Sequence, residues 1–84
     1  MKEIIQVNGH SVEIIASIWN GKESVSYDGH VVSSRRNIST FSSIHSFKVD
    51  EADESVIYEV QILSGIFTVG YAIRRNGIIQ AHKP

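Results

Sequence analysis

Residues 55–75 constrain the fold most, because apolar side chains recur at every second position along two consecutive arms. An alternation of period two is typical of a β-strand that buries one face. A turn is predicted at Ser64-Gly65, between the arms, so the stretch is expected to form a long hairpin at the centre of a β-sheet. The residues expected on its buried face are Val56, Tyr58, Val60 and Ile62 in the first arm and Phe67, Val69, Tyr71 and Ile73 in the second.

Asparagine or aspartate followed by glycine marks further turns along the chain. Such pairs readily supply the positive φ angles of tight hairpin turns, so a short strand is expected on each side of them. No stretch has helical periodicity. We therefore predict an all-β fold, an antiparallel β-sandwich or curled barrel of seven to eight short strands joined by hairpin turns, in a single all-β domain covering residues 1–84. The pairs are Asn8-Gly9, Asn20-Gly21, Asp28-Gly29 and Asn76-Gly77.

The composition excludes several classes of protein. The chain has 84 residues and no cysteine, so disulfides, thiolate metal sites and cysteine nucleophiles are excluded. Its formal net charge of −1 gives no general attraction to nucleic acid or to an anionic membrane. The start of the chain lacks the features of a secretory signal, and no span approaches the roughly 20 apolar residues that cross a bilayer. We therefore predict a cytoplasmic protein without a nucleic-acid or membrane partner.

The strand expected over residues 11–18 carries apolar residues on both of its faces. Every second residue from Val12 onward is apolar, which completes one buried face, whereas Ile15 and Trp19 fall on the opposite parity. Two interpretations stay open. Either the fold covers these two side chains, or they form an exposed patch that binds another protein or a second copy of the chain. The residues of the predicted buried face are Val12, Ile14, Ala16 and Ile18.

Two arginine pairs, Arg35-Arg36 and Arg74-Arg75, could together hold phosphate or carboxylate groups. Adjacent residues on a strand point to opposite faces, so each pair is expected to contribute one arginine to a given surface. The first pair lies in residues 33–43, a polar stretch that is either the longest loop or a ragged edge strand. The candidate interaction surface consists of Ile15, Trp19, Arg35 and Arg36.

No constellation of residues indicates catalysis or metal binding. The histidines lack the close spacing of a structural metal site, although the parity that His45 shares with Phe47 predicts that it points inward. The acidic run at residues 50–54 lacks the central glycine of an EF-hand calcium loop and is interpreted as a solvated turn, so a substitution at Glu51 is expected to have almost no effect. We predict no catalytic, cofactor or metal site, and a protein that is not an enzyme. The histidines are His10, His30, His45 and His82.

Glycines and alternating apolar residues follow a definite order in the first half of the chain, from Gly9 to a polar interval that ends at Phe47. This order is similar to the repeat pattern of the Fas apoptosis inhibitory molecule family, whose domains are compact all-β sandwiches. Arg35-Arg36-Asn37 stands where that pattern has an aromatic segment. The resemblance covers about half the chain, implies a non-enzymatic interaction or protective module, and supplies no catalytic residues. The matching residues are Gly9, Val12, Ile14, Gly21-Lys22, Val25, Tyr27-Asp28-Gly29, Val32 and Phe47.

Three functions are compatible with these observations. The leading hypothesis is a non-catalytic binding or protein-interaction module, because outward apolar residues occur without a catalytic constellation. The alternative is a small-ligand or carbohydrate-binding β domain that stacks its ligand on Trp19 and on tyrosines, although the parity of the tyrosines places them in the core. The third is an enzyme, which a deep pocket holding His45 together with acids would favour. The tyrosines are Tyr27, Tyr58 and Tyr71.

Overall fold

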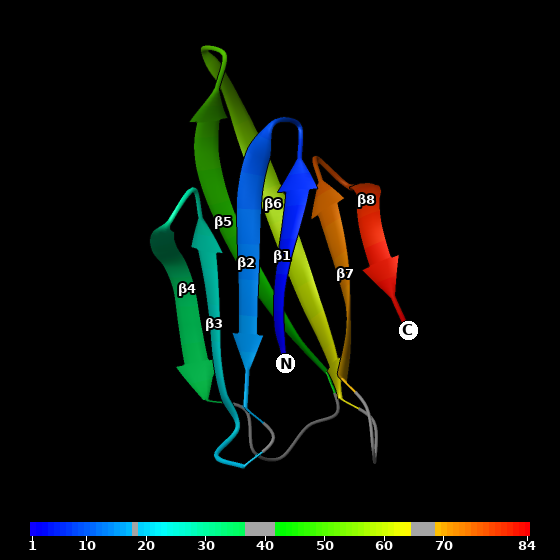
Figure 1. Cartoon of the computed structure of the whole chain (residues 1–84). Helices are drawn as coiled ribbons and strands as arrows, with labels where there is room; N and C mark the ends of the chain where they lie inside the picture. Colours follow the sequence, from blue (N-terminus) through cyan, green and yellow to red (C-terminus); the bar gives the residue numbers. More distant parts are fainter. Residues whose placement is uncertain (18, 37–41, 65–68) are drawn as a thin grey trace. The chain divides into compact units, whose positions relative to one another are not determined.

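The structure, a computed structural model, describes residues 1–17, 19–36, 42–64 and 69–84. The predicted turn residue Gly65 and the predicted buried residues Ile18 and Phe67 lie outside these ranges. The described residues form antiparallel β-strands that follow one another along the chain (Figure 1). The strands are β1 (Lys2–Val7), β2 (His10–Ala16), β3 (Lys22–Tyr27), β4 (His30–Arg36), β5 (Ser42–Glu51), β6 (Glu54–Ser64), β7 (Val69–Arg75) and β8 (Ile78–Lys83).

These strands form two separate four-stranded sheets, in the orders β1-β2-β3-β4 and β5-β6-β7-β8. The all-β prediction is therefore confirmed. Because neither sheet closes into a barrel in the described part of the chain, the fold fits an eight-stranded sandwich and not the curled barrel. The chain also divides into two compact units, Met1–Thr40 and Phe41–Pro84, which we call unit 1 and unit 2. The single domain over residues 1–84 stays a prediction.

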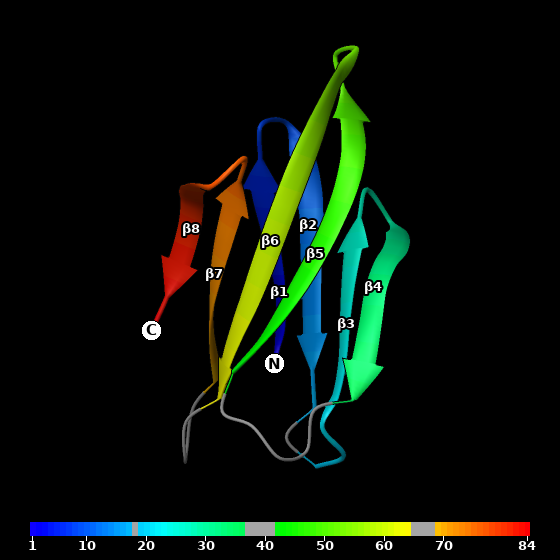
Figure 2. The ribbon, with the colours of Figure 1, turned by 180° about the vertical axis from the view of Figure 1, so that it is seen from behind.

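In unit 2, β6 lies between β5 and β7 and supplies the centre of the sheet (Figure 2). Tyr71 and Ile73 of β7 are buried on the same face, and Val69 is half-buried. The predicted central hairpin with one apolar face is therefore confirmed for the described residues. The fully buried residues of β6 are Val56, Tyr58, Val60 and Ile62.

In unit 1, the hairpin from β1 to β2 turns at Asn8 and Gly9, whose φ angles of 51° and 80° are those of the predicted turn. The alternation of β2 is also confirmed, because Val12 and Ile14 are fully buried and Ala16 is nearly so. The polar stretch over residues 33–43, for which a loop and an edge strand are both predicted, begins as an edge strand, since β4 runs to Arg36 at the edge of its sheet.

The two units have the same order of strands, the same bulge position and the same final turn, and we call this common arrangement the shared frame. Each is a meander of four strands, and in each the pairing of the last two strands shifts at a β-bulge shortly before the final turn. The bulge lies between Val25 and Ser26 in unit 1 and between Ile73 and Arg74 in unit 2. A bulge is a positional feature of a sheet, so its recurrence at one position indicates that the same four-stranded element is used twice.

The residue before the turn glycine is held in the same way in both units. The backbone N–H of Asp28 donates to the carbonyl of Ser11, and Asp28 Oδ1 accepts from the N–H of Ser11, both at 2.9 Å. Asn76 makes the equivalent two bonds with Ile57, at 2.8 and 2.9 Å. A carboxylate and an amide serve equally, so the frame requires an acceptor oxygen at this position and not a charge.

At two corresponding positions of the shared frame, the units differ. First, the residue of unit 2 that corresponds to Lys22 is Gly70, where an added Cβ would lie 2.2 Å from the carbonyl oxygen of Lys83. Second, residues 50–55 replace the short turn of Asn8 and Gly9, which lengthens the hairpin between β5 and β6. Figure 1 shows this hairpin projecting beyond the turn between β7 and β8.

Candidate functional site

The exposed face of the sheet in unit 1 carries two of the residues predicted for interaction, Ile15 and Arg36. Ile15 is 40% exposed and lies opposite Ser24 of β3, whose own neighbour on β4 is Ser34. One row further along, Lys22 lies opposite Arg36. We use the name Trp19 surface for the set Ile15, Ser17, Trp19, Asn20, Lys22, Ser24 and Arg36.

Trp19 lies in the connection between β2 and β3 and is 92% exposed. Backbone bonds close this connection, because the N–H of Ser17 donates to the carbonyl of Lys22 at 3.0 Å and Gly21 donates back to Ser17 at 3.1 Å. Asn20 Oδ1 also accepts from the N–H of Lys22 at 2.9 Å. Trp19 therefore projects from a turn that its neighbours hold. Trp19 and Ile15 are exposed, which excludes the interpretation that the fold covers them, whereas binding of another protein or of a second copy stays a prediction.

A depression of about 280 Å³ lies beside this turn. Its lining combines one apolar side chain with hydroxyl, amide and ammonium groups, a mixture that can contact an apolar group and also hydrogen-bond to it. The lining residues are Ile15, Ser17, Asn20, Lys22 and Ser24.

The two arginines of the first pair point to opposite faces of β4, as predicted. Arg36 shares the exposed face with Lys22, its cross-strand neighbour. Arg35 lies opposite Glu23, which is buried on the other face of the sheet. The structure therefore brings Ile15, Lys22 and Arg36 to one face and places Arg35 on the other.

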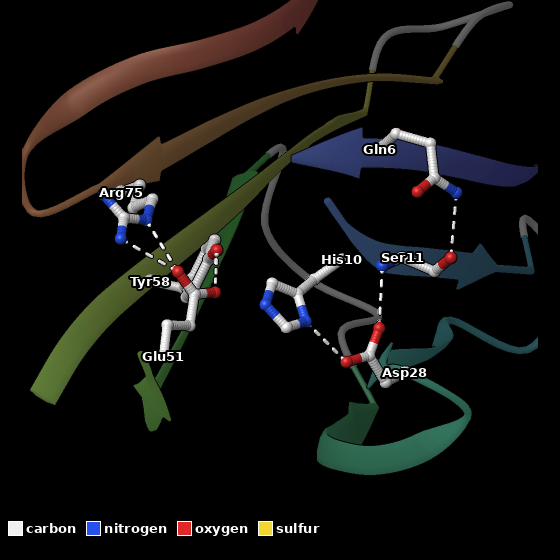
Figure 3. Close-up of polar contacts among 7 residues, drawn as sticks. All are labelled: Gln6, His10, Ser11, Asp28, Glu51, Tyr58 and Arg75. Atoms are coloured by element: carbon white, nitrogen blue, oxygen red, sulfur yellow. Dashed lines mark hydrogen bonds and ion pairs between the residues drawn. The ribbon is translucent and has the colours of Figure 1, made fainter. Parts of the chain in front are cut away.

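A second polar cluster lies on the buried face of unit 2 (Figure 3). The hydroxyl of Tyr58 donates to Glu51 Oε2 at 2.5 Å, and Arg75 Nε and Nη2 each lie 2.9 Å from Glu51 Oε1. The Glu51 side chain is 2% exposed and that of Arg75 is 24% exposed. Tyr58 also stacks on Phe47, with ring centroids 5.3 Å apart. All the groups of this cluster bind one another, which indicates a structural role.

The prediction of a solvated turn over residues 50–54 is wrong for Glu51. β5 continues through this residue, and the turn consists only of Ala52 and Asp53, with φ angles of 49° and 64°. The signal was present in the sequence, because Glu51 continues the parity of Phe47 and Val49 and so points to the buried face. A glutamate in an acidic run is usually solvated, and the bonds to Tyr58 and Arg75 make its burial possible here.

Alkaline pH is expected to destabilise the protein through this cluster. Burial and the hydrogen bond to Glu51 raise the pKa of Tyr58 to about 12, from 10.0. The folded state therefore keeps a proton that the unfolded state loses, so this contribution is complete below pH 10 and is lost as the pH rises to 12. We expect denaturation midpoints to fall over this range and to fall less in Tyr58→Phe. Equal pH profiles for the two proteins would contradict this assignment.

His10 and Asp28 of unit 1 form another side-chain pair shown in Figure 3. His10 Nδ1 lies 2.7 Å from Asp28 Oδ2, and the His10 ring stacks on Tyr27 at 5.1 Å. The hydroxyl of the neighbouring Ser11 accepts a bond from Gln6 Nε2 at 2.8 Å. Because Asp28 corresponds to Asn76 in the shared frame, its bonds to Ser11 have a structural role in holding the turn.

The remaining chemistry-bearing residues predicted from the sequence are dispersed. His45 is buried, as its parity predicts, whereas His30 and His82 are exposed. Tyr58 and Tyr71 belong to the core and offer no stacking surface. No group of three or more histidine, aspartate or glutamate side chains in the described ranges is placed to hold a metal ion. None of the residues that line the depression is a histidine or an acid.

Comparison with known proteins adds no family to this description. No family model matches the chain, and no curated protein or solved structure is significantly similar to it. The resemblance to the Fas apoptosis inhibitory molecule family therefore stays a prediction. The residues described here include no helix long and apolar enough to span a membrane. Fold and site together define an all-β protein of two four-stranded meanders with an exposed tryptophan beside a mixed polar and apolar depression.

Proposed function

We propose that this protein is a non-catalytic protein-interaction module that binds through the Trp19 surface. The observation that supports this function is the 92% exposure of Trp19 beside the depression that Ile15 lines. A large aromatic side chain left in water on a small β protein is unfavourable, and tryptophan is the residue most enriched at the centres of protein interfaces. A protein surface, a second copy of this chain included, is therefore the expected ligand.

Trp19→Ser tests this function. We expect the wild type to self-associate at high micromolar concentration and the variant to do so with a dissociation constant raised about tenfold, since interface tryptophans commonly contribute that much. The variant should keep the wild-type denaturation midpoint, because the side chain makes almost no buried contact. Sedimentation velocity over a concentration series measures the association.

Ile78→Ser is the matched control, because Ile78 is 67% exposed but belongs to unit 2. It should leave association unchanged if the Trp19 surface is the binding site. A wild type that stays monomeric throughout the series would contradict self-association through this surface. Equal effects of the two substitutions would contradict the Trp19 surface as the binding site.

A carbohydrate-binding domain is the second candidate, because an exposed tryptophan beside serine, asparagine and lysine side chains is also suited to stacking on a sugar ring. The intrinsic fluorescence of Trp19, the single tryptophan, distinguishes the two functions. A saturable change on addition of an oligosaccharide, in a protein that remains monomeric, would support the sugar-binding function over the protein-interaction function.

A further inference from the structure

Lys22 and Arg36 form an unusual pair on the Trp19 surface. They lie directly opposite each other on neighbouring strands, where like charges are destabilising. Both residues are exposed, and neither side chain has an ion-pair partner in the part of the chain that the structure describes. We call Lys22 and Arg36 the basic pair. Its repulsion would be relieved by a carboxylate that approaches from outside.

The shared frame does not require the basic pair. Unit 2 builds the same strand pairing and the same bulge with Gly70 at the position of Lys22. The residues of unit 2 that correspond to Ile15 and Ser24 are Gln61 and Ala72, and Gln61 accepts a bond from Arg74 at 3.4 Å. The shared frame can thus be built without a cation at the position of Lys22 and without an apolar residue at the position of Ile15, so the needs of the fold do not explain either residue.

The same chain carries a matching group of acids. Asp50, Asp53 and Glu54 are exposed around the turn between β5 and β6, and none pairs with a base among the described residues. We call these three residues the acidic tip. They lie in the segment that lengthens this hairpin relative to its counterpart in unit 1. Glu51 of the same segment binds Tyr58 and Arg75 and is not part of the tip.

We infer that the acidic tip of one copy of the protein docks on the Trp19 surface of a second copy. Carboxylates of the tip bind Lys22 and Arg36, and the narrow turn enters the depression beside Ile15. The inference rests on the proposed function, which places binding at the Trp19 surface, and it names the occupant as a second copy. Opposite exposed charges favour this occupant, because the chain has eight basic and nine acidic residues and little net repulsion between copies.

Each copy has one basic pair and one acidic tip, so this contact is heterologous. Association of this type continues beyond a dimer unless it closes into a ring. Because the contact joins exposed charges, it should weaken as salt rises from about 0.05 M to about 0.5 M.

Two neutralised variants test the inference without placing like charges together. Lys22→Gln/Arg36→Gln removes the basic pair, and Asp53→Asn/Glu54→Gln removes two acids of the tip. In sedimentation velocity at low salt, we expect the dissociation constant of each variant alone to rise about tenfold or more. An equimolar mixture keeps one intact tip and one intact basic pair, so it should form dimers with wild-type affinity and no larger species.

The pattern of results separates this inference from the proposed function. If Trp19→Ser weakens association but the neutralised variants do not, the Trp19 surface binds a different part of the second copy and the acidic tip is the wrong occupant. If both neutralised variants are defective but their mixture stays monomeric, the two groups do not contact each other and the inference is overturned. A wild type that is monomeric at all concentrations overturns the inference, while binding of another protein to the Trp19 surface is unaffected by that result. All the substituted residues are exposed, so none of the substitutions should lower the denaturation midpoint.

Discussion

Val60→Asp is expected to leave the protein unfolded. Val60 is fully buried in β6, where its cross-strand neighbours are His45 of β5 and Ile73 of β7. Burying a carboxylate among these side chains costs several kcal/mol, which is comparable to the roughly 5 kcal/mol that holds a small domain together. Amide chemical-shift dispersion in a two-dimensional NMR spectrum measures the outcome.

Ile57→Asp provides the control on the same strand. Ile57 belongs to the opposite face of β6 and is 51% exposed, so an aspartate there stays in water and the variant should remain folded. A dispersed spectrum for Val60→Asp, or the loss of structure in both variants, would show that the buried face of β6 has been misassigned.

Glu51→Ala is expected to destabilise the protein by about 2 kcal/mol, because it leaves the buried hydroxyl of Tyr58 without its acceptor. The loss of the contact with Arg75 adds to this effect. The hydrogen bond with Glu51 also raises the pKa of the Arg75 guanidinium, so the contact favours the charged form of Arg75. Chemical denaturation at neutral pH measures the free energy of unfolding.

Glu54→Ala is the matched control, since Glu54 lies directly opposite Glu51 across the turn and is exposed. It should change the free energy of unfolding by less than about 0.5 kcal/mol. Equal denaturation midpoints for the two variants would show that Glu51 is solvated, as the acidic run suggests, and would contradict its buried position.

The sequence by itself determined the class of fold and most of the strands. Period-two alternation assigns Val56, Tyr58 and Val60 to one face whatever lies beside them, because successive side chains of a strand point to opposite sides. Residue pairs such as Asn8-Gly9 assign turns for a similarly local reason, since they tolerate positive φ angles. Local geometry of this kind is encoded within a few neighbouring residues, and it was predicted correctly.

The candidate site was visible in part. The parity of Ile15 and Trp19 indicated side chains outside the core, but it could not decide between a covered and an exposed position. The sequence placed both Arg35 and Arg36 in the candidate surface, and only the register of β3 and β4 shows that Arg36 shares a face with Lys22 whereas Arg35 does not. Lys22 itself was not singled out, since a lone lysine on a short strand carries no signal until its cross-strand neighbour is known.

Only the tertiary structure decided between the charge of Glu51, which favours solvent, and its parity, which favours burial. Only the tertiary structure shows that one frame is used twice. The charge of Glu51 argues for solvent, and its burial depends on Tyr58 and Arg75, which reach it from two other strands. Corresponding residues of the two units, such as Lys22 and Gly70, differ in type, so the sequence does not show the repeat. The position of the bulge and the register of the strands do show it. Pairings between distant strands are set by which side chains can share a buried face, and that is a property of the assembled sheet.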